Sequence, residues 1–182
     1  MLDRSETSEL FPELEGYLDQ IELCRKQLRQ LTKGMSDEAA NWRPDAEDHR
    51  SVYSYIIHLT NSDGYWFRQI IGGEPFIDRG GKETGRKSEW DEEGNLADAL
   101  DRWEETSLKS QNEIIRNLTL EQLGEKVYVP SGGIKGNVPR RWAILHQIRH
   151  MGEHQGHIQL TRQLWEAMNN VKGTARSFAL RS

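Results

Sequence analysis

The sequence has little cysteine, no excess of positive charge and no long apolar run. Its single cysteine, Cys24, excludes an intrachain disulfide and suits a reducing compartment. Acidic residues outnumber basic ones by 29 to 24, and a formal net charge of −5 disfavours nucleic acid or an anionic membrane surface as a partner. No stretch approaches the roughly 20 apolar residues of a membrane-spanning helix, and the first residues lack a secretion signal. We therefore expect a cytoplasmic protein that binds neither nucleic acid nor membrane.

The composition is that of a folded domain with a charged surface. Apolar residues make up 35% and charged residues 29% of the 182 residues, and both signs of charge are interspersed. This length allows one domain with a sizeable core. We expect a single domain over residues 1–168, followed by a flexible tail over residues 169–182, where Gly and Ser mix with basic residues.

Apolar residues recur at three- and four-residue steps in four segments, which predicts four amphipathic helices. The first segment carries Leu10, Leu14, Tyr17, Leu18, Ile21, Leu28 and Leu31. The second carries Val52, Tyr55, Ile56, Leu59, Trp66 and Ile70. The third carries Leu96, Leu100, Trp103, Ile114, Ile115 and Leu118, and the fourth runs from Pro139 to about Met168. Four such helices predict an all-α fold, a four-helix bundle.

Cap and breaker residues divide these segments. Gly34 ends the first helix, Ser51 and Asn95 are N-caps for the second and third, and Pro139 suits the first turn of the fourth. Residues 74–94 are polar, with Trp90 as the one large apolar residue, and predict a long surface loop. Residues 127–138 predict a small hairpin before the last helix.

Four of the six histidines lie within twelve residues of the fourth helix: His146, His150, His154 and His157. At 100° per residue they lie at about 0°, 40°, 80° and 20°, on one narrow face. Imidazoles one helical turn apart can bind the same metal ion. His58, on the second helix, is the candidate for a third ligand. Three protein ligands leave a coordination position for water or substrate, as in reactive sites.

The same residues resemble a known family. Trp42-Arg43-Pro44, the stretch from Ser51 to Leu59 with Tyr65-Trp66 after it, and the run from His150 to His157 are similar to motifs of the DinB/YfiT-like superfamily. The resemblance covers nearly the whole chain. It implies a four-helix bundle with up-down-down-up connections, frequently a homodimer.

The resemblance also implies a three-histidine metal site, whose ligands fall on His58, His150 and His154. Many members follow the last ligand with Arg-Gly-Gln, where this chain has Gln155-Gly156-His157. Two alternatives therefore stay open: His146 pairs with His150, or His157 assists His154.

Zinc suits three imidazoles best, and nickel is possible. Such an ion lowers the pKa of a bound water or thiol. The resemblance implies chemistry like that of thiol S-transferases that use a low-molecular-weight thiol cosubstrate. We expect a metal-dependent transferase of this kind acting on a small molecule, or a hydrolase, and the alternative is a non-catalytic stress-related or ligand-binding protein with a vestigial or stabilising metal site.

Four further residues are candidates for the pocket or for contacts with the ligands. His146 and His157 share the histidine face, and Glu153 and Arg149 lie beside it, at about −20° and −60° on the same scale. Glu153 could act as a base, or be a solvated carboxylate; Arg149 could hold an anionic group, or form a surface ion pair. Cys24 is expected to be a packing residue.

Overall fold

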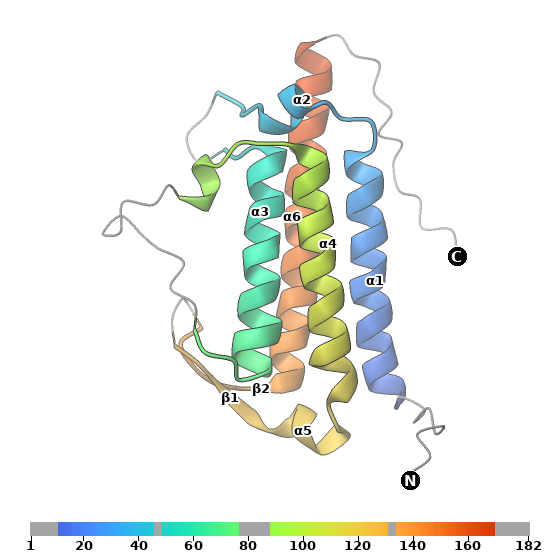
Figure 1. Ribbon diagram of the computed structural model, residues 1–182, viewed down its shortest axis with the longest axis vertical. Coiled ribbons are helices and arrows are strands. Elements are labelled where there is room, and N and C mark those ends of the chain that lie inside the picture. The colour runs from blue at the N-terminus through green and yellow to red at the C-terminus, as the bar shows by residue number, and fades with distance from the viewer. Residues whose placement is uncertain (1–10, 46–48, 77–87, 131–133, 170–182) are drawn as a thin grey trace.

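The computed structural model describes residues 11–45, 49–76, 88–130 and 134–169. Its helices are α1 (Pro12–Thr32), α2 (Asp37–Asn41), α3 (Val52–Asp63), η1 (Gly64–Ile71), η3 (Glu89–Asp91), α4 (Leu96–Glu113), η4 (Ile115–Asn117), α5 (Leu120–Gly124) and α6 (Arg140–Met168), and its strands are β1 (Lys126–Val129) and β2 (Gly136–Pro139). The long helices α1, α3 with η1, α4 and α6 form the predicted four-helix bundle (Figure 1).

The long helices follow the predicted up-down-down-up order. In Figure 1, α1 and α6 run upward, whereas α3 and α4 both run downward. α1 packs against α6 and α3 packs against α4, while α3 also contacts α6. The parallel pair α3 and α4 needs a connection along the full height of the bundle. This connection contains the predicted loop at 74–94, of which residues 77–87 lie outside the described part.

The predicted N-caps are confirmed. The Ser51 hydroxyl accepts a hydrogen bond from the backbone N–H of Ser54 at 3.0 Å, and the Asn95 side-chain oxygen accepts one from the N–H of Asp98 at 3.0 Å. Each bond satisfies an amide that has no partner within the helix. Gly34 has φ = 74°, a conformation that favours glycine, so the chain can turn away just after α1.

Two helices differ in detail from the prediction. The second extends over the predicted residues and ends at Ile71, but its last part is the π-helix η1, a wider turn that apolar spacing alone does not reveal. The third helix ends at Glu113 and not near Leu118. There the side-chain amide of Asn117 donates to the backbone oxygens of Asn112 and Glu113 at 3.1 and 2.9 Å, and thus caps the last carbonyls. Ile115 remains fully buried beyond this end.

The predicted hairpin is present. β1 pairs with β2 in antiparallel register, with Val127 opposite Val138. Pro139 ends β2 and takes the N-cap position of α6, one residue before the predicted first turn. Arg140 then ties three segments together, because its guanidinium donates to the backbone oxygens of Ile71 and Gln122. Residues 131–133 lie outside the described part.

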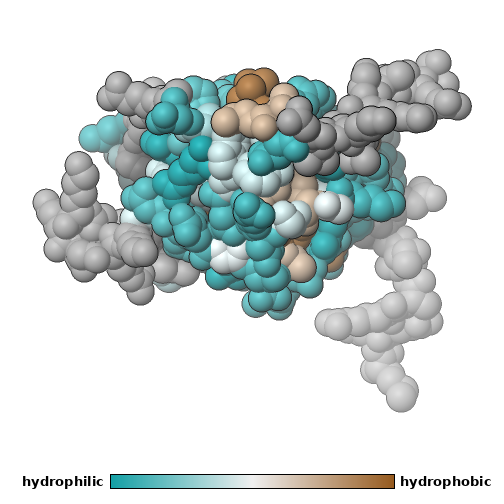
Figure 2. Space-filling view, turned by 90° about the horizontal axis from the view of Figure 1, so that it is seen from above, coloured by the Kyte–Doolittle hydropathy of each residue, from teal (hydrophilic) through white to brown (hydrophobic). Residues whose placement is uncertain are grey.

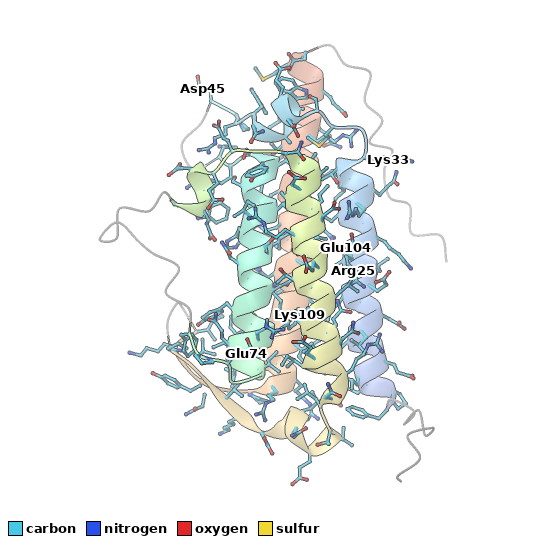
Figure 3. The ribbon with its side chains drawn as sticks, viewed as in Figure 1. Arg25, Lys33, Asp45, Glu74, Glu104 and Lys109 are labelled. Carbon is cyan, nitrogen blue, oxygen red and sulfur yellow. The ribbon has the colours of Figure 1, made fainter. Side chains whose placement is uncertain are left out.

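Charged side chains line the outer side of the contact between α1 and α4. Arg29 donates to Asp101 at 2.7 Å and also pairs with Glu104. Arg25, only 6% exposed, pairs with Glu22 and lies across from Glu104 (Figure 3). Except for Asp101, these residues line a surface cavity of about 270 Å³. This side of the bundle is therefore held by ion pairs above an aliphatic interior.

Seen from the end that carries α2, the surface is mostly hydrophilic, and its most hydrophobic part lies at one edge (Figure 2). Within the described part of the chain, no helix is both long enough and apolar enough to cross a bilayer.

Cys24 is buried at 7% exposure, as expected of a packing residue, and burial raises the pKa of its thiol to about 11. The predicted tail at 169–182 lies, except for Asn169, outside the described residues.

Candidate metal centre

Three imidazoles from two helices meet inside the bundle. His58 projects from α3, and His150 and His154 lie one turn apart on α6. The Nε2 atoms of His58 and His150 are 3.2 Å apart, and those of His150 and His154 are 2.9 Å apart. All three residues offer ring nitrogens within 4.8 Å of one another, and no other group of this kind occurs among the described residues. The predicted partners His58, His150 and His154 thus lie together.

These distances fit a divalent ion. Two nitrogens bound tetrahedrally at 2.0–2.1 Å from zinc lie about 3.4 Å apart. The observed separations of 3.2 and 2.9 Å are close to that value. Neutral imidazole is also the form that binds metal, and His150 and His154 are held neutral. Burial, followed by the neighbouring imidazoles, lowers the pKa of His150 to about 4 and that of His154 to about 3.

Each imidazole has a separate partner at its other nitrogen. His58 Nδ1 lies 2.7 Å from Glu89 Oε1, His150 Nδ1 lies 3.3 Å from Ser62 Oγ, and His154 Nδ1 lies 3.3 Å from His157 Nδ1. Such partners orient metal-binding histidines and fix their tautomers. The Nδ1 atoms therefore face outward to three different groups, while the Nε2 atoms face one another.

The sequence pattern indicated neither Ser62 nor Glu89 as a partner of the histidines. Glu89 belongs to η3, at the far end of the long connection, and its second oxygen accepts a hydrogen bond from Asn61 Nδ2 at 2.6 Å. A carboxylate can only accept here, so His58 donates from Nδ1 and keeps a lone pair on Nε2. The only sequence signal in this stretch was Trp90, the residue that follows.

Trp90 covers one side of the centre. Its ring stacks on His58 with 4.4 Å between centroids, and Tyr55 meets it edge-on at 5.8 Å. The guanidinium of Arg50 lies 5.6 Å from the Trp90 ring centroid, within cation–π range. The predicted surface loop at 74–94 thus returns to the bundle at 88–91 and places an aromatic ring and a carboxylate beside His58.

The other predicted pocket residues lie in three places. His157 contacts His154, as described above. His146 stacks on Trp142 with 5.0 Å between centroids, and its ring lies 6.2 Å from that of His150. It is outside the three-histidine cluster. Arg149 and Glu153 form an ion pair with each other at 2.7 Å on the exposed side of α6.

A buried carboxylate lies behind the centre. Asp63 is fully buried at the end of α3, and burial raises its pKa to about 7, against the effect of hydrogen bonds from Gln147, Trp103 and Ser107 and of the nearby charge of Arg25. Neither composition nor periodicity indicated that Asp63 is buried, because an Asp on a helix is usually exposed.

A cavity of about 180 Å³ lies next to the three-histidine cluster. It is lined by His49, Tyr55, His157, Leu160, Thr161 and Leu164. Tyr55 and His157 also pack against His154, with ring centroids 5.3 and 5.4 Å away. Tyr55 and His157 therefore contact both the cavity and the three-histidine cluster.

Solved structures with the same fold confirm the architecture. A conserved protein from Enterococcus faecalis matches with a TM-score of 0.64 and 13% identity, over 84% of this chain and 96% of that one. A DinB-like protein from Bacillus cereus matches with a TM-score of 0.59 and 12% identity, over 88% and 96% of the two chains. These identities show a shared fold alone. No curated protein sequence matches the chain.

One family's sequence pattern matches almost the whole four-helix bundle. The pattern described as Mycothiol-S-transferase matches residues 13–167, from the first turn of α1 to the last turn of α6. This confirms the resemblance to DinB/YfiT-like proteins that the histidine motifs suggested. The chain belongs to the mycothiol S-transferase family, and its fold is the DinB-like four-helix bundle.

Proposed function

We propose that this protein is a metal-dependent S-transferase that joins a low-molecular-weight thiol to a small electrophile. The observation that carries the proposal is the convergence of three Nε2 atoms, from His58, His150 and His154, at separations that suit one divalent ion. Zinc fits this all-imidazole set best, and nickel is the second choice. Family membership supports a thiol such as mycothiol as cosubstrate.

His58, His150 and His154 would hold the divalent ion, and because all three are neutral the ion would keep its full charge, which would lower the pKa of a thiol bound to it. No thiol of the chain itself serves this purpose. Cys24 is buried, and burial raises the pKa of its thiol to about 11, so it stays protonated. The reacting sulfur therefore comes from the cosubstrate.

The chain's own groups around the centre have distinct tasks. Glu89 and Ser62 hold the rings of His58 and His150. When His154 binds through Nε2, its Nδ1 carries the proton and donates to His157 Nδ1. His157 then holds its own proton on Nε2, where it can donate a hydrogen bond to a substrate. Trp90 excludes water from one side of His58.

The adjoining cavity is the proposed place for the electrophile. Leu160 and Leu164 give it an apolar lining, while Tyr55 and Thr161 supply hydroxyl groups. Its volume of about 180 Å³ is below the 300–1,000 Å³ of typical ligand pockets, so it suits a small organic group rather than a large one. Burial raises the pKa of Tyr55, which keeps its phenol protonated as a donor.

Metal content and turnover test the proposal together. Protein purified without a histidine tag should contain near one metal ion per chain, and the double substitution His58→Ala with His154→Ala should abolish it. Full metal content in that variant removes the three-histidine site. A panel of thiols and electrophiles then tests transfer; metal without turnover favours the binding-protein alternative, and ester or amide cleavage without a thiol favours the hydrolase. A cytoplasmic location, a homodimer and the absence of nucleic-acid binding stay predictions.

A further inference from the structure

We propose that a hydrogen-bond relay of fixed direction, running from Asp63 through Gln147 and Ser62, holds His150 in the tautomer that offers Nε2 to a metal ion. The inference rests on the proposed metal centre and extends it into the bundle interior. Asp63, Gln147 and Ser62 are positioning residues, because none of them touches substrate or the open coordination position.

The direction of the relay is set at Asp63. Trp103 Nε1 lies 3.1 Å from Asp63 Oδ2, and Gln147 Nε2 lies 2.7 Å from Asp63 Oδ1. An indole N–H can only donate, and above the Asp63 pKa of about 7 its carboxylate accepts at both oxygens. All three side chains are buried to 1% exposure or less, so water does not compete. Asp63 therefore fixes which end of the Gln147 amide faces it.

The amide passes this direction on. With its nitrogen toward Asp63, Gln147 presents Oε1 to Ser62, whose hydroxyl donates to it at 2.9 Å. The single hydroxyl proton of Ser62 is thereby used. At 3.3 Å from His150 Nδ1, the oxygen of Ser62 can then only accept. His150 accordingly carries its proton on Nδ1 and a lone pair on Nε2.

Two lone pairs then face each other. Glu89 fixes the same tautomer in His58, and the Nε2 atoms of His58 and His150 are 3.2 Å apart. Without a proton between them, these nitrogens repel unless a cation lies nearby. The relay thus prepares the site for a metal ion before the ion arrives. Its contribution is to metal affinity rather than to packing.

An isosteric substitution should reverse the relay. Asp63→Asn turns one acceptor into an N–H₂ donor. The indole of Trp103 cannot reverse, so the new amide keeps its oxygen toward Trp103 and turns its N–H₂ toward Gln147. The Gln147 amide then flips, and Ser62 accepts from Gln147 and donates to His150. His150 is left with its proton on Nε2, where the metal ion should bind.

A second substitution should restore the direction. Trp103→Phe removes the donor that cannot reverse, so the amide introduced by Asp63→Asn can present its oxygen to Gln147 again. Ser107, which also contacts Asp63, has a hydroxyl that donates or accepts and tolerates either arrangement. Rescue of metal binding by a second change in the core is not expected if Asp63 and Trp103 matter only for packing.

The experiment measures zinc affinity of metal-depleted protein at pH 8 by competition with a chromogenic chelator. Contacts one step beyond metal ligands change affinity by about 10- to 100-fold. We expect Asp63→Asn to bind zinc about tenfold more weakly than wild type. The zinc affinities of Trp103→Phe and of the double variant should lie within about threefold of the wild-type affinity. Asp101→Asn, an exposed position on α4, is the matched control and should bind like wild type.

Each outcome has one meaning. Unchanged affinity in Asp63→Asn, or a double variant as weak as Asp63→Asn, overturns the relay. A wild-type protein that binds no zinc overturns the proposed function instead. If Asp63→Asn does not fold, long-range ¹H–¹⁵N spectra of zinc-loaded wild type decide. A proton on His150 Nδ1 supports the relay, and coordination through Nδ1 overturns it.

Discussion

The inward faces of α1 and α3 share an aliphatic core but differ in the polar groups that they bring to it. α1 buries Leu14, Ile21 and Leu28 completely, whereas the second half of α3 adds the partly buried His58 and the buried Ser62 and Asp63 to its apolar residues. Burying a polar group costs free energy unless it is hydrogen-bonded, and each of these three is. The comparison shows that both helices stabilise the core, and that α3 also buries polar groups whose hydrogen bonds position the metal ligands.

Removal of a metal ligand should have the largest effect, and only when metal is present. We expect His150→Ala to lose the stabilisation that zinc gives the wild-type protein, about 4 kcal/mol at a thousandfold excess over the dissociation constant. Urea unfolding with zinc and with EDTA measures this difference. In EDTA the variant should unfold near the wild-type midpoint, and a large loss of stability there would show that α6 needs His150 for packing.

On α1, a substitution should lower stability without affecting zinc binding. Leu28→Ala should lower the free energy of unfolding by about 2–5 kcal/mol, because it leaves a cavity in the aliphatic interior. Its zinc affinity, measured in the folded protein, should equal that of wild type. Weaker zinc binding in this variant would contradict the division of tasks between the two helices.

Glu89→Gln should weaken zinc binding by about 10- to 100-fold, because a neutral amide is a poorer acceptor for His58 Nδ1–H than a carboxylate. Chelator competition measures the change. Glu153→Gln is the matched control, since Glu153 is exposed and pairs with Arg149. Equal affinities in the two variants would show that η3 does not act on the centre.

The pH dependence of the metal-free protein should report the buried imidazoles. Their pKa values of about 4 for His150 and about 3 for His154 lie below the ordinary 6.5, so between pH 6.5 and 4 the unfolded chain binds protons that the folded protein does not. Stability should therefore fall as the pH falls through this range.

Asp63 acts in the opposite direction. Its pKa is raised to about 7 from 3.8, so the folded state holds a proton that the unfolded chain has lost. For His150, His154 and Asp63 alone, two protons bound by the unfolded chain against one bound by the folded protein give a net loss of about 1.4 kcal/mol per pH unit on acidification. The lowered pKa of His146 adds to this loss. Urea midpoints across this range measure the slope. In a variant with His150→Gln and His154→Gln the slope should vanish or reverse, because the proton that Asp63 holds in the folded state then opposes what His146 contributes. A slope unchanged there would mean that other groups cause it.

Arg149→Ala should have the smallest effect. Arg149 and Glu153 are 63% and 48% exposed, and exposed ion pairs contribute about 0–1 kcal/mol. We expect a change in unfolding free energy below about 1 kcal/mol and unchanged zinc affinity. A loss of turnover with an anionic substrate would instead give Arg149 the substrate-binding role that its place beside the histidines allowed.

Local pattern was enough to predict the bundle. Periodic apolar residues indicated the helices, and Ser51 and Asn95 marked two starts, because a cap acts on amides only two or three residues away. The histidine face of α6 is equally local, since a fixed 100° per residue places His150 and His154 together. His58 was harder: the helix pattern made it only the available candidate for a third ligand, and the resemblance to the family motif then implied that it is one.

Only the tertiary structure brought Glu89 to His58 and joined Asp63 to His150. Glu89 lies 31 positions from His58 in the sequence, and Asp63 reaches His150 only through Gln147 and Ser62. No rule of sequence spacing connects either pair. A polar residue's role depends on which groups face it after folding, whereas an apolar residue needs only to be covered. The sequence by itself therefore determined the helices and the histidine face. The direction of the buried hydrogen bonds, which decides where each imidazole keeps its proton, became visible only in three dimensions.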